Sequence, residues 1–326
     1  MKRIGIIGCS NIAALSIILP AKVVNGIEIV AVASREYEKA DMFAKKYDIS
    51  KVYGGYEELM ASGSCDAVYI ALPPALHAQN VKMAIGYSLD VLVEKPMSLN
   101  VSDYLDIKDL SEIKRKVVLE GLMIQHHPWQ DYIKKIIERK EYGKLRRIKS
   151  VITSNSWNEQ NANFRMHREL GGGVFLDEGS YWLQFIQKIL KLDFKEIQVK
   201  VNSMLNGVDW DVEVNGEIDG IEIEFWASNC SKSTSTHYLE LEEATITIKN
   251  FFRAAVSPSI ITVMIERHKG ELDLIRFEPE GYYKNQLTLF KNMDYLHSRA
   301  FIEESGDRIN WIEKIYKFLG EVLNGY

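Results

Sequence analysis

The segment RIGIIGCSNIA, residues 3–13, sets the fold class of this chain. A short apolar run ends at Gly8, and a helical pattern opens directly after it, which is the strand–turn–helix context of a phosphate-binding turn. Gly8 permits the tight turn, and Ala13 keeps the helix close to the strand. Ser10 stands where a second glycine is usual, so its side chain weakens the motif, although its hydroxyl can donate to a phosphate oxygen. The segment therefore predicts a dinucleotide site, with a plain strand–helix turn that binds nothing as the alternative.

The candidate cofactor contacts in this segment are Gly8, Ser10, Asn11 and Ile12. Further along, Ser34 and Arg35 follow the second apolar run, where an acidic residue would bind the ribose hydroxyls of NAD(H). A guanidinium beside a hydroxyl suits a 2′-phosphate, so the sequence favours NADP(H) over NAD(H). The alternative is that Arg35 is a solvated surface residue.

The first 122 residues alternate short apolar runs with longer helical patterns, which predicts strand–helix–strand units around a parallel sheet. We expect strands at 3–7, 28–33, 67–71, 91–94 and 117–121, and helices at 36–46 and 77–87. In the first of these helices, Ala40, Phe43, Ala44 and Tyr47 share one apolar face.

After residue 122 the pattern changes. Helices are expected at 128–139 and near 179–190, followed by strands at 196–201, 210–218, 221–226, 238–241, 244–249, 261–266 and 271–277, and by helices at 283–296 and 309–323. Strands in succession without intervening helices predict a mostly antiparallel sheet. We therefore predict an α/β protein, with a Rossmann dinucleotide-binding domain at 1–122 and an α+β domain with an open sheet, for substrate binding and oligomerisation, at 123–326. The last helix is placed to pack back on the first domain.

Composition and charge narrow the class of protein. The chain has 326 residues, and its 45 acidic and 40 basic side chains give a net charge of −5, which argues against a nucleic-acid partner. The basic residues Lys144, Arg146, Arg147 and Lys149 alternate with apolar ones and are interpreted as an exposed strand edge. No stretch approaches the ~20 apolar residues of a membrane span. Three widely spaced cysteines suit neither a disulfide framework nor a zinc site, so we expect a cytoplasmic protein without a metal.

Four ordered motifs carry a family resemblance. LPPALH at 72–77 and EKP at 94–96 each follow an expected parallel strand, and Gly172-Gly173 and DEGSY at 177–181 lie in the second domain. With these motifs the chain resembles the glucose-fructose oxidoreductase and inositol dehydrogenase (Gfo/Idh/MocA) family, from Gly5 to about Leu190. The resemblance implies hydride transfer with a nicotinamide cofactor. It is nearest to the branch with sugar dehydrogenases and sugar-nucleotide 3-ketoreductases, because Tyr181 stands where inositol dehydrogenases carry histidine.

The resemblance also assigns catalytic roles. Lys95 is implied to be the catalytic lysine, held at the strand end by Glu94 and Pro96, with the Lys95–Pro96 bond in the cis form. Tyr181 is implied to exchange the proton with the substrate oxygen, and Asp177 to orient the substrate hydroxyl or the lysine. Asp177 and Tyr181 are four residues apart, so they share one helix face if Gly179 does not break the helix. The alternative for this pair is a helix-start carboxylate and an interfacial tyrosine.

By the same resemblance, Leu72, Pro73, His77 and Glu94 join Lys95 as cofactor contacts, with a helix-capping role for His77 as the alternative. The candidate substrate contacts are Gln125, His126, Trp157 and Arg165. A purely structural role for one of the histidines at 126 and 127 explains the sequence equally well. For Arg165 the alternative is a solvated loop residue, which is the usual state of loop arginines.

The expected substrate is a small molecule, a sugar or sugar nucleotide, bound by a homodimer or homotetramer that pairs through the C-terminal sheet. Trp210, Phe225 and Trp226 suit such an interface, and core packing explains them equally well. Two other functions stay open: a nicotinamide-binding sensor that has lost its chemistry, and a reductase of an imine or another acceptor that is not a sugar.

Overall fold

The computed structural model describes residues 1–155, 157 and 163–324, which form two compact units. The first unit contains Met1–Met123 and Tyr283–Asn310. The second contains Ile124–Tyr282 and the chain from Trp311 onward. The C-terminal helix α11 (Tyr295–Asn324) therefore contributes residues to both units. None of the described helices is long and apolar enough to cross a membrane.

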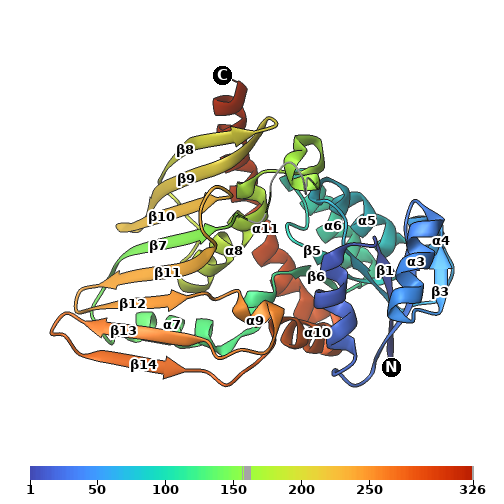
Figure 1. Cartoon of the computed structure of the whole chain (residues 1–326), viewed down its shortest axis with the longest axis horizontal. Coiled ribbons are helices and arrows are strands. Elements are labelled where there is room, and N and C mark those ends of the chain that lie inside the picture. Colours follow the sequence, from blue (N-terminus) through green and yellow to red (C-terminus); the bar gives the residue numbers. More distant parts are fainter. Residues whose placement is uncertain (156, 158–162, 325–326) are drawn as a thin grey trace. The chain divides into compact units, whose positions relative to one another are not determined.

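The first unit is built on a six-stranded sheet in the order β3-β2-β1-β4-β5-β6, in which every neighbouring pair is parallel. Figure 1 labels β1, β3, β5 and β6 of this sheet. The strands are β1 (Lys2–Ile7), β2 (Ile27–Ala33), β3 (Lys51–Tyr53), β4 (Ala67–Ile70), β5 (Asp90–Glu94) and β6 (Val118–Gly121). The strand order reverses between β1 and β4, and the carboxyl ends of strands at such a reversal are where open α/β sheets bind ligands.

Helices cover both faces of this sheet and make two separate cores. One core joins Ile7 and Val93 of the sheet to α4 (Tyr56–Ala61), α5 (His77–Gly86), α6 (Val101–Lys114) and the first part of α11. The other joins Ile6 and Leu92 to the helical segment α1–η1–α2 (Asn11–Ala13, Ala14–Ile18, Leu19–Ala21), α3 (Tyr37–Tyr47) and α10 (Tyr282–Asn292). Each strand thus alternates its apolar side chains between two dry layers, as expected for a buried parallel sheet.

The second unit is built on an eight-stranded sheet in the order β14-β13-β12-β11-β7-β10-β9-β8, antiparallel except for the pair β7 and β10. Its strands are β7 (Leu145–Thr153), β8 (Glu196–Leu205), β9 (Val208–Ile218), β10 (Ile221–Ser228), β11 (Thr234–Leu241), β12 (Ala244–Lys249), β13 (Thr262–Arg267) and β14 (Leu272–Arg276). Helices α7 (Pro128–Arg139) and α8 (Val174–Ile189) pack on one face through Trp129, Phe185 and Trp182, which contact His237 and Phe225 of the sheet.

The predicted fold class is confirmed by these two sheets. Helix 128–139 has the predicted bounds, but α8 begins at Val174, five residues before the expected start. The two helices expected at 283–296 and 309–323 are instead α10 and the single 30-residue α11. Strand β3 and helices α4 and α6 were not predicted, and a short helix, α9 (Arg253–Val256), interrupts the predicted run of strands.

The interpretation of residues 144–149 as a strand edge is wrong, because β7 lies in the middle of its sheet between β10 and β11. Arg147 and Lys149 of β7 point to one face, where Glu224 of the neighbouring β10 lies near both. Arg147 pairs with Glu224 on one side and lies 3.5 Å from Glu240 on the other. The alternation of polar and apolar residues shows that one face of a strand is polar, but it does not show that the strand lies at an edge. Ion pairs between neighbouring strands allow a central strand to have a charged face.

Candidate functional site

The turn between β1 and α1 has the backbone that a phosphate-binding turn needs. Gly8 has a left-handed φ of +98°, and a Cβ there would lie 2.8 Å from the carbonyl oxygen of Ala71, so glycine is required. The buried hydroxyl of Ser10 has no hydrogen-bond partner among the described residues. Asn11 is exposed and Ile12 is half-buried. An orphaned hydroxyl beside the unpaired N–H groups of a helix start fits an anionic group.

The end of β2 presents a cation beside this turn. Ser34 is buried and accepts the backbone N–H of Glu36 at 3.3 Å, whereas Arg35 is exposed. Arg35 lies close enough to Tyr56 to oppose the increase that burial causes in the pKa of that phenol. Lys39, in α3, similarly opposes the increase that burial causes in the pKa of the Cys9 thiol. The sequence analysis does not single out Lys39 or Tyr56. Lys39 could have been found, because it is a second basic residue four positions after Arg35.

Lys95 follows β5 in a loop that buried side chains hold. The Lys95–Pro96 peptide bond is cis. Glu120 of β6 is 3% exposed, and its Oε1 accepts the backbone N–H of Met97 at 3.0 Å. Its Oε2 accepts from Arg308 Nη2 at 2.6 Å, and Arg308 is 2% exposed. The loop is thereby attached, through one carboxylate, to helix α11.

His77 attaches the same loop to the end of β4. Its Nδ1 lies 2.7 Å from the carbonyl oxygen of Pro96, and its Nε2 lies 2.7 Å from that of Leu72. A neutral imidazole carries one N–H, so only one of the two carbonyls can accept from it at a time. His77 is 1% exposed, and burial lowers its pKa. The histidine predicted to contact a cofactor thus contacts the two segments that carry Leu72, Pro73 and Lys95.

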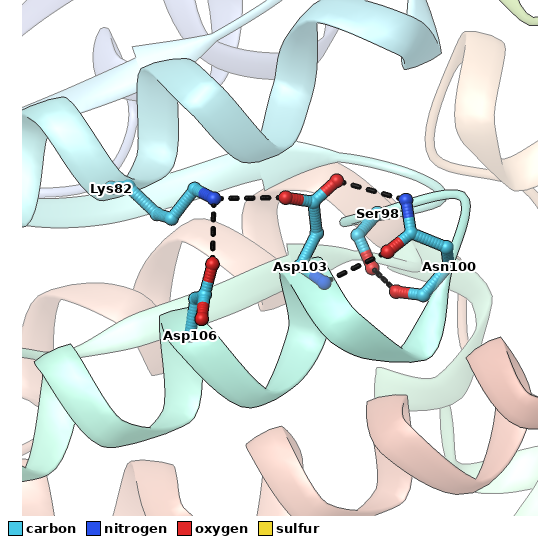
Figure 2. Close-up of polar contacts among 5 residues, drawn as sticks. All are labelled: Lys82, Ser98, Asn100, Asp103 and Asp106. Carbon is cyan, nitrogen blue, oxygen red and sulfur yellow. Dashed lines mark hydrogen bonds and ion pairs between the residues drawn. The ribbon is translucent and has the colours of Figure 1, made fainter.

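The far end of the Lys95 loop is fixed by the start of α6, as Figure 2 shows. The side chain of Asn100 accepts the backbone N–H of Asp103 at 2.8 Å, which caps the helix. Ser98 donates to the carbonyl oxygen of Asn100 at 3.0 Å. Lys82 of α5 donates to Asp103 at 2.8 Å and to Asp106 at 2.9 Å, joining the two helices. The Asn100 cap and the Ser98 hydrogen bond therefore hold the end of the loop, and Lys82 fixes the helix that follows it.

Glu94, which precedes the lysine, ends a chain of hydroxyl groups. Tyr69 of β4 is fully buried and donates to Glu94 Oε1 at 2.5 Å. Ser16, in the π-helical turn η1, donates to the Tyr69 oxygen at 2.5 Å. Burial and the Glu94 carboxylate hold the pKa of Tyr69 well above its usual range. This link between the segment after the phosphate-binding turn and the EKP motif was not predicted, because Tyr69 appears in the sequence only as a strand residue.

In the second unit, Asp177 and Tyr181 lie four residues apart on α8, which Gly179 does not break. Arg165 donates to Asp177 through Nε at 2.6 Å and through Nη2 at 3.1 Å. The Arg165 guanidinium also lies over the ring of Trp157, 4.3 Å from its centroid. Arg165 and Trp157, both predicted as substrate contacts, thus lie beside Asp177, which is predicted to be catalytic. The sequence does not predict the pairing of Arg165 with Asp177.

Tyr181 is 9% exposed, and its ring meets that of Phe252 edge to face at a centroid distance of 4.8 Å. Trp157 packs against a small cluster of Met166, Val208 and Trp210. Packing against these neighbours restricts the directions of both rings.

Gln125 and His126 are half-buried in the 3-10 turn η3 (Met123–His126). The neighbouring His127 is 2% exposed; its Nδ1 accepts the backbone N–H of Trp129 at 3.3 Å, which caps α7, and its ring contacts Phe277. His127 is therefore the histidine with a structural role. Among the described residues, no group of three or more His, Cys, Asp or Glu side chains could hold a metal ion.

Comparison with known proteins agrees with this arrangement of a Rossmann sheet followed by a second, mostly antiparallel sheet. A model of the oxidoreductase family with an NAD-binding Rossmann fold matches residues 2–122, and the GFO/IDH/MocA C-terminal domain matches residues 131–248. The chain therefore belongs to the GFO/IDH/MocA family.

Among its relatives is dTDP-3,4-didehydro-2,6-dideoxy-alpha-D-glucose 3-reductase of Saccharopolyspora spinosa, 34% identical over 179 residues, which cover 55% of this chain and 53% of that protein. D-xylose 1-dehydrogenase (NADP(+)) 2 of Haloferax volcanii is 26% identical over 318 residues, 96% of each chain. The chain spans about half the length of most of the curated relatives it matches first.

A crystal structure of KijD10, a 3-ketoreductase from Actinomadura kijaniata in complex with NADP and TDP-benzene, has the same fold. It superimposes with a TM-score of 0.86 over 96% of each chain, at 20% sequence identity.

Proposed function

We propose that this chain is an NADP(H)-dependent oxidoreductase that transfers a hydride between the nicotinamide and a hydroxyl or keto carbon of a sugar or sugar nucleotide. Family membership and the names of its relatives support the reaction class. The observation that carries the cofactor assignment is the β1–α1 turn, where a glycine that no other residue can replace precedes a buried serine hydroxyl without a described partner.

The cofactor is proposed to lie along the carboxyl ends of the parallel strands. Gly8, Ser10, Asn11 and Ile12 would hold the pyrophosphate through backbone N–H groups and the serine hydroxyl. Ser34 and Arg35 would bind the 2′-phosphate, because a guanidinium forms paired hydrogen bonds with phosphate oxygens. The nicotinamide and its ribose would contact the segments that carry Leu72, Pro73, Glu94 and Lys95. His77 would hold these two segments together through its contacts with Leu72 and Pro96.

Lys95, Asp177 and Tyr181 are proposed to act on one substrate carbon. The cofactor, when bound, supplies or accepts the hydride. Tyr181 would exchange the proton with the substrate oxygen, and because a free phenol has a pKa of about 10, it needs a neighbouring cation to favour the phenolate. The Lys95 ammonium would supply that cation and stabilise negative charge on the reacting oxygen. An Asp177 paired with Arg165 accepts hydrogen bonds rather than supplying the proton, so it would orient a substrate hydroxyl.

Four further substrate-side assignments stay proposals: Gln125, His126, Trp157 and Arg165. Of these, Arg165 and Trp157 would act as a unit with Asp177, since the guanidinium bridges the two. We also propose a cytoplasmic homodimer or homotetramer that pairs through the C-terminal sheet, in which the domain at 1–122 binds the cofactor and the domain at 123–326 binds the substrate.

The first experiment is a binding titration of the purified protein with NADPH and NADH, followed by a nicotinamide-absorbance screen against keto-sugars, sugar nucleotides, aldoses and cyclitols. We expect tighter binding of NADPH and turnover of at least one of these substrates. Binding without any turnover would favour the sensor function or an acceptor that is not a sugar, and the absence of NADPH binding would contradict the proposal.

The residues are tested with Lys95→Ala and Tyr181→Phe. We expect turnover to fall at least about a hundredfold in each, as loss of an oxyanion-stabilising or proton-transfer group does. The dissociation constant of NADPH should change little, because neither side chain is assigned to the phosphates. Unchanged turnover in Lys95→Ala would overturn the catalytic assignment.

A further inference from the structure

Asp209 of β9 is a buried carboxylate that the reaction scheme leaves unused. It is 1% exposed, and its Oδ2 accepts the backbone N–H of Phe175 in the first turn of α8 at 2.7 Å. The N-cap of this helix is Gly173, which has no side chain to satisfy the unpaired N–H groups of the helix start. Asp209 supplies, from a distant strand, the acceptor that residue 173 cannot.

The two glycines before α8 leave room for close packing, Gly173 against Asp209 and Gly172 against the backbone of Arg165. A Cβ on Gly173 would lie 2.2 Å from Asp209 Oδ1, and φ at this residue is +110°. A Cβ on Gly172 would lie 2.5 Å from the carbonyl oxygen of Arg165. The N–H of Gly173 donates to that same carbonyl at 2.9 Å. The start of α8, Asp209 and the backbone of Arg165 therefore pack closely against one another.

The start of α8 also carries the residues proposed to act on the substrate. Asp177 lies in the first turn of α8 and binds the Arg165 side chain, and Tyr181 follows one turn later. We propose that Asp209 is a positioning residue for the reaction: its carboxylate holds the first turn of α8 and so sets where Asp177 and Tyr181 lie. The inference rests on the proposed function of those two residues.

The charge of Asp209 is sensitive to pH. Burial raises its pKa from 3.8 to about 6, against the opposing effects of the N–H groups of Phe175, Val174 and Asp209 itself and of the Arg168 guanidinium. In the part of the chain that the structure describes, Tyr316 of α11 also faces it. An ionised carboxylate accepts through both oxygens, whereas a protonated one turns one oxygen into a donor, so the acceptors that set the direction of α8 are complete above about pH 6. Turnover should therefore rise as the pH increases through about 6.

Stability should respond in the opposite direction. Because the folded pKa of Asp209 lies above its unfolded value, its contribution to stability is greatest below about pH 3.9 and falls as the pH rises towards 6. A group that only stabilised the fold would not increase activity over the same pH range in which it reduces stability. This opposition is the signature of a positioning role.

The test compares Asp209→Asn with Asp211→Asn. Both replace a carboxylate on β9 with its amide, but Asp211 accepts from Asn202 and Trp226 and has no contact with α8 among the hydrogen bonds of the described residues. We expect Asp209→Asn to lower kcat at pH 8 at least about tenfold, to leave the dissociation constant of NADPH unchanged, and to remove the decrease in kcat below about pH 6. Asp211→Asn should keep the pH profile. A folded Asp209→Asn protein with the wild-type kcat and pH profile would overturn the inference.

Hydrogen exchange of the unmodified protein gives a reading that needs neither a variant nor turnover. After correction for intrinsic rates, the amides in the first turn of α8 should exchange faster at pH 8 than at pH 5, because an opening that exposes Asp209 to water is favoured once the buried carboxylate is ionised, whereas those of α7 should not. Equal protection at both pH values would overturn the inference. If Lys95→Ala and Tyr181→Phe left turnover unchanged, the proposed function would fail, while the exchange measurement would still report whether Asp209 holds α8.

Discussion

The two segments that present the candidate catalytic residues are held by different means. The Lys95 loop of the first unit is fixed along its length, by His77 at Pro96, by Glu120 at Met97 and by Asn100 at the start of α6. The start of α8 in the second unit rests on one carboxylate, Asp209, and on glycines that leave room for it. A loop has no regular internal ladder of hydrogen bonds and needs several external ones, whereas in a helix that ladder extends the placement of the first turn to the rest.

The largest effect on the Lys95 loop is expected from Glu120→Ala. This change removes the acceptor of Met97 and leaves the buried Arg308 guanidinium without its carboxylate, so the free energy of unfolding should fall by about 3–5 kcal/mol. Urea denaturation measures the loss. Glu303→Ala is the matched control, because its carboxylate is 54% exposed beside Lys108 and should cost less than about 1 kcal/mol. Equal losses in the two variants would show that the buried carboxylate does not anchor the loop.

A smaller effect, confined to the cofactor, is expected from Arg35→Asp. A carboxylate there would repel a 2′-phosphate and accept from ribose hydroxyls, so the preference for NADPH over NADH should fall at least about tenfold. Titration with both nucleotides measures the ratio. Lys45→Asp makes the same change of charge on the exposed side of α3 and should leave the ratio unaltered. If Arg35→Asp still preferred NADPH, another residue would have to bind the 2′-phosphate, and Lys39 would be the first to test.

The smallest effect is expected from Lys82→Ala, at the periphery of the same loop. Its ion pairs with Asp103 and Asp106 in Figure 2 are partly exposed, so thermal or urea unfolding should change by less than about 1 kcal/mol. Turnover should be unaffected, because Asn100 still caps α6. A loss as large as that of Glu120→Ala would mean that the surface cluster, and not the buried carboxylate, positions the loop.

Much of the fold could be predicted from local patterns. The apolar run and glycine at 3–8 mark the first strand and its turn, and the apolar face shared by Ala40 and Ala44 marks α3, because periodicity reports which side of an element is buried. The same patterns mislead at β7, where charged residues predict a strand edge, and at α11, where a polar middle predicts two helices in place of one. In both cases the partners that satisfy the charges lie on other elements.

The candidate site divides in the same way. Motifs such as EKP at 94–96 and the glycine pair at 172–173 are recognisable in the sequence, because each requires particular residue types at neighbouring positions. Their supports were not: His77 was assigned to the cofactor, and Tyr69, Glu120 and Asp209 were not singled out at all. Each of these acts on a residue far away in the chain, and a buried polar residue in a strand has no signature of its own.

The sequence by itself determined the class of fold, the order of its elements and the identity of the motif residues, because hydrophobic periodicity and special backbone positions are properties of neighbouring residues. Only the tertiary structure decided the partners: Glu120 with Arg308, 188 residues away, Arg165 with Asp177, and Asp209 with the first turn of α8. A buried charge must find its partner wherever the chain passes, and one sequence does not record where that is.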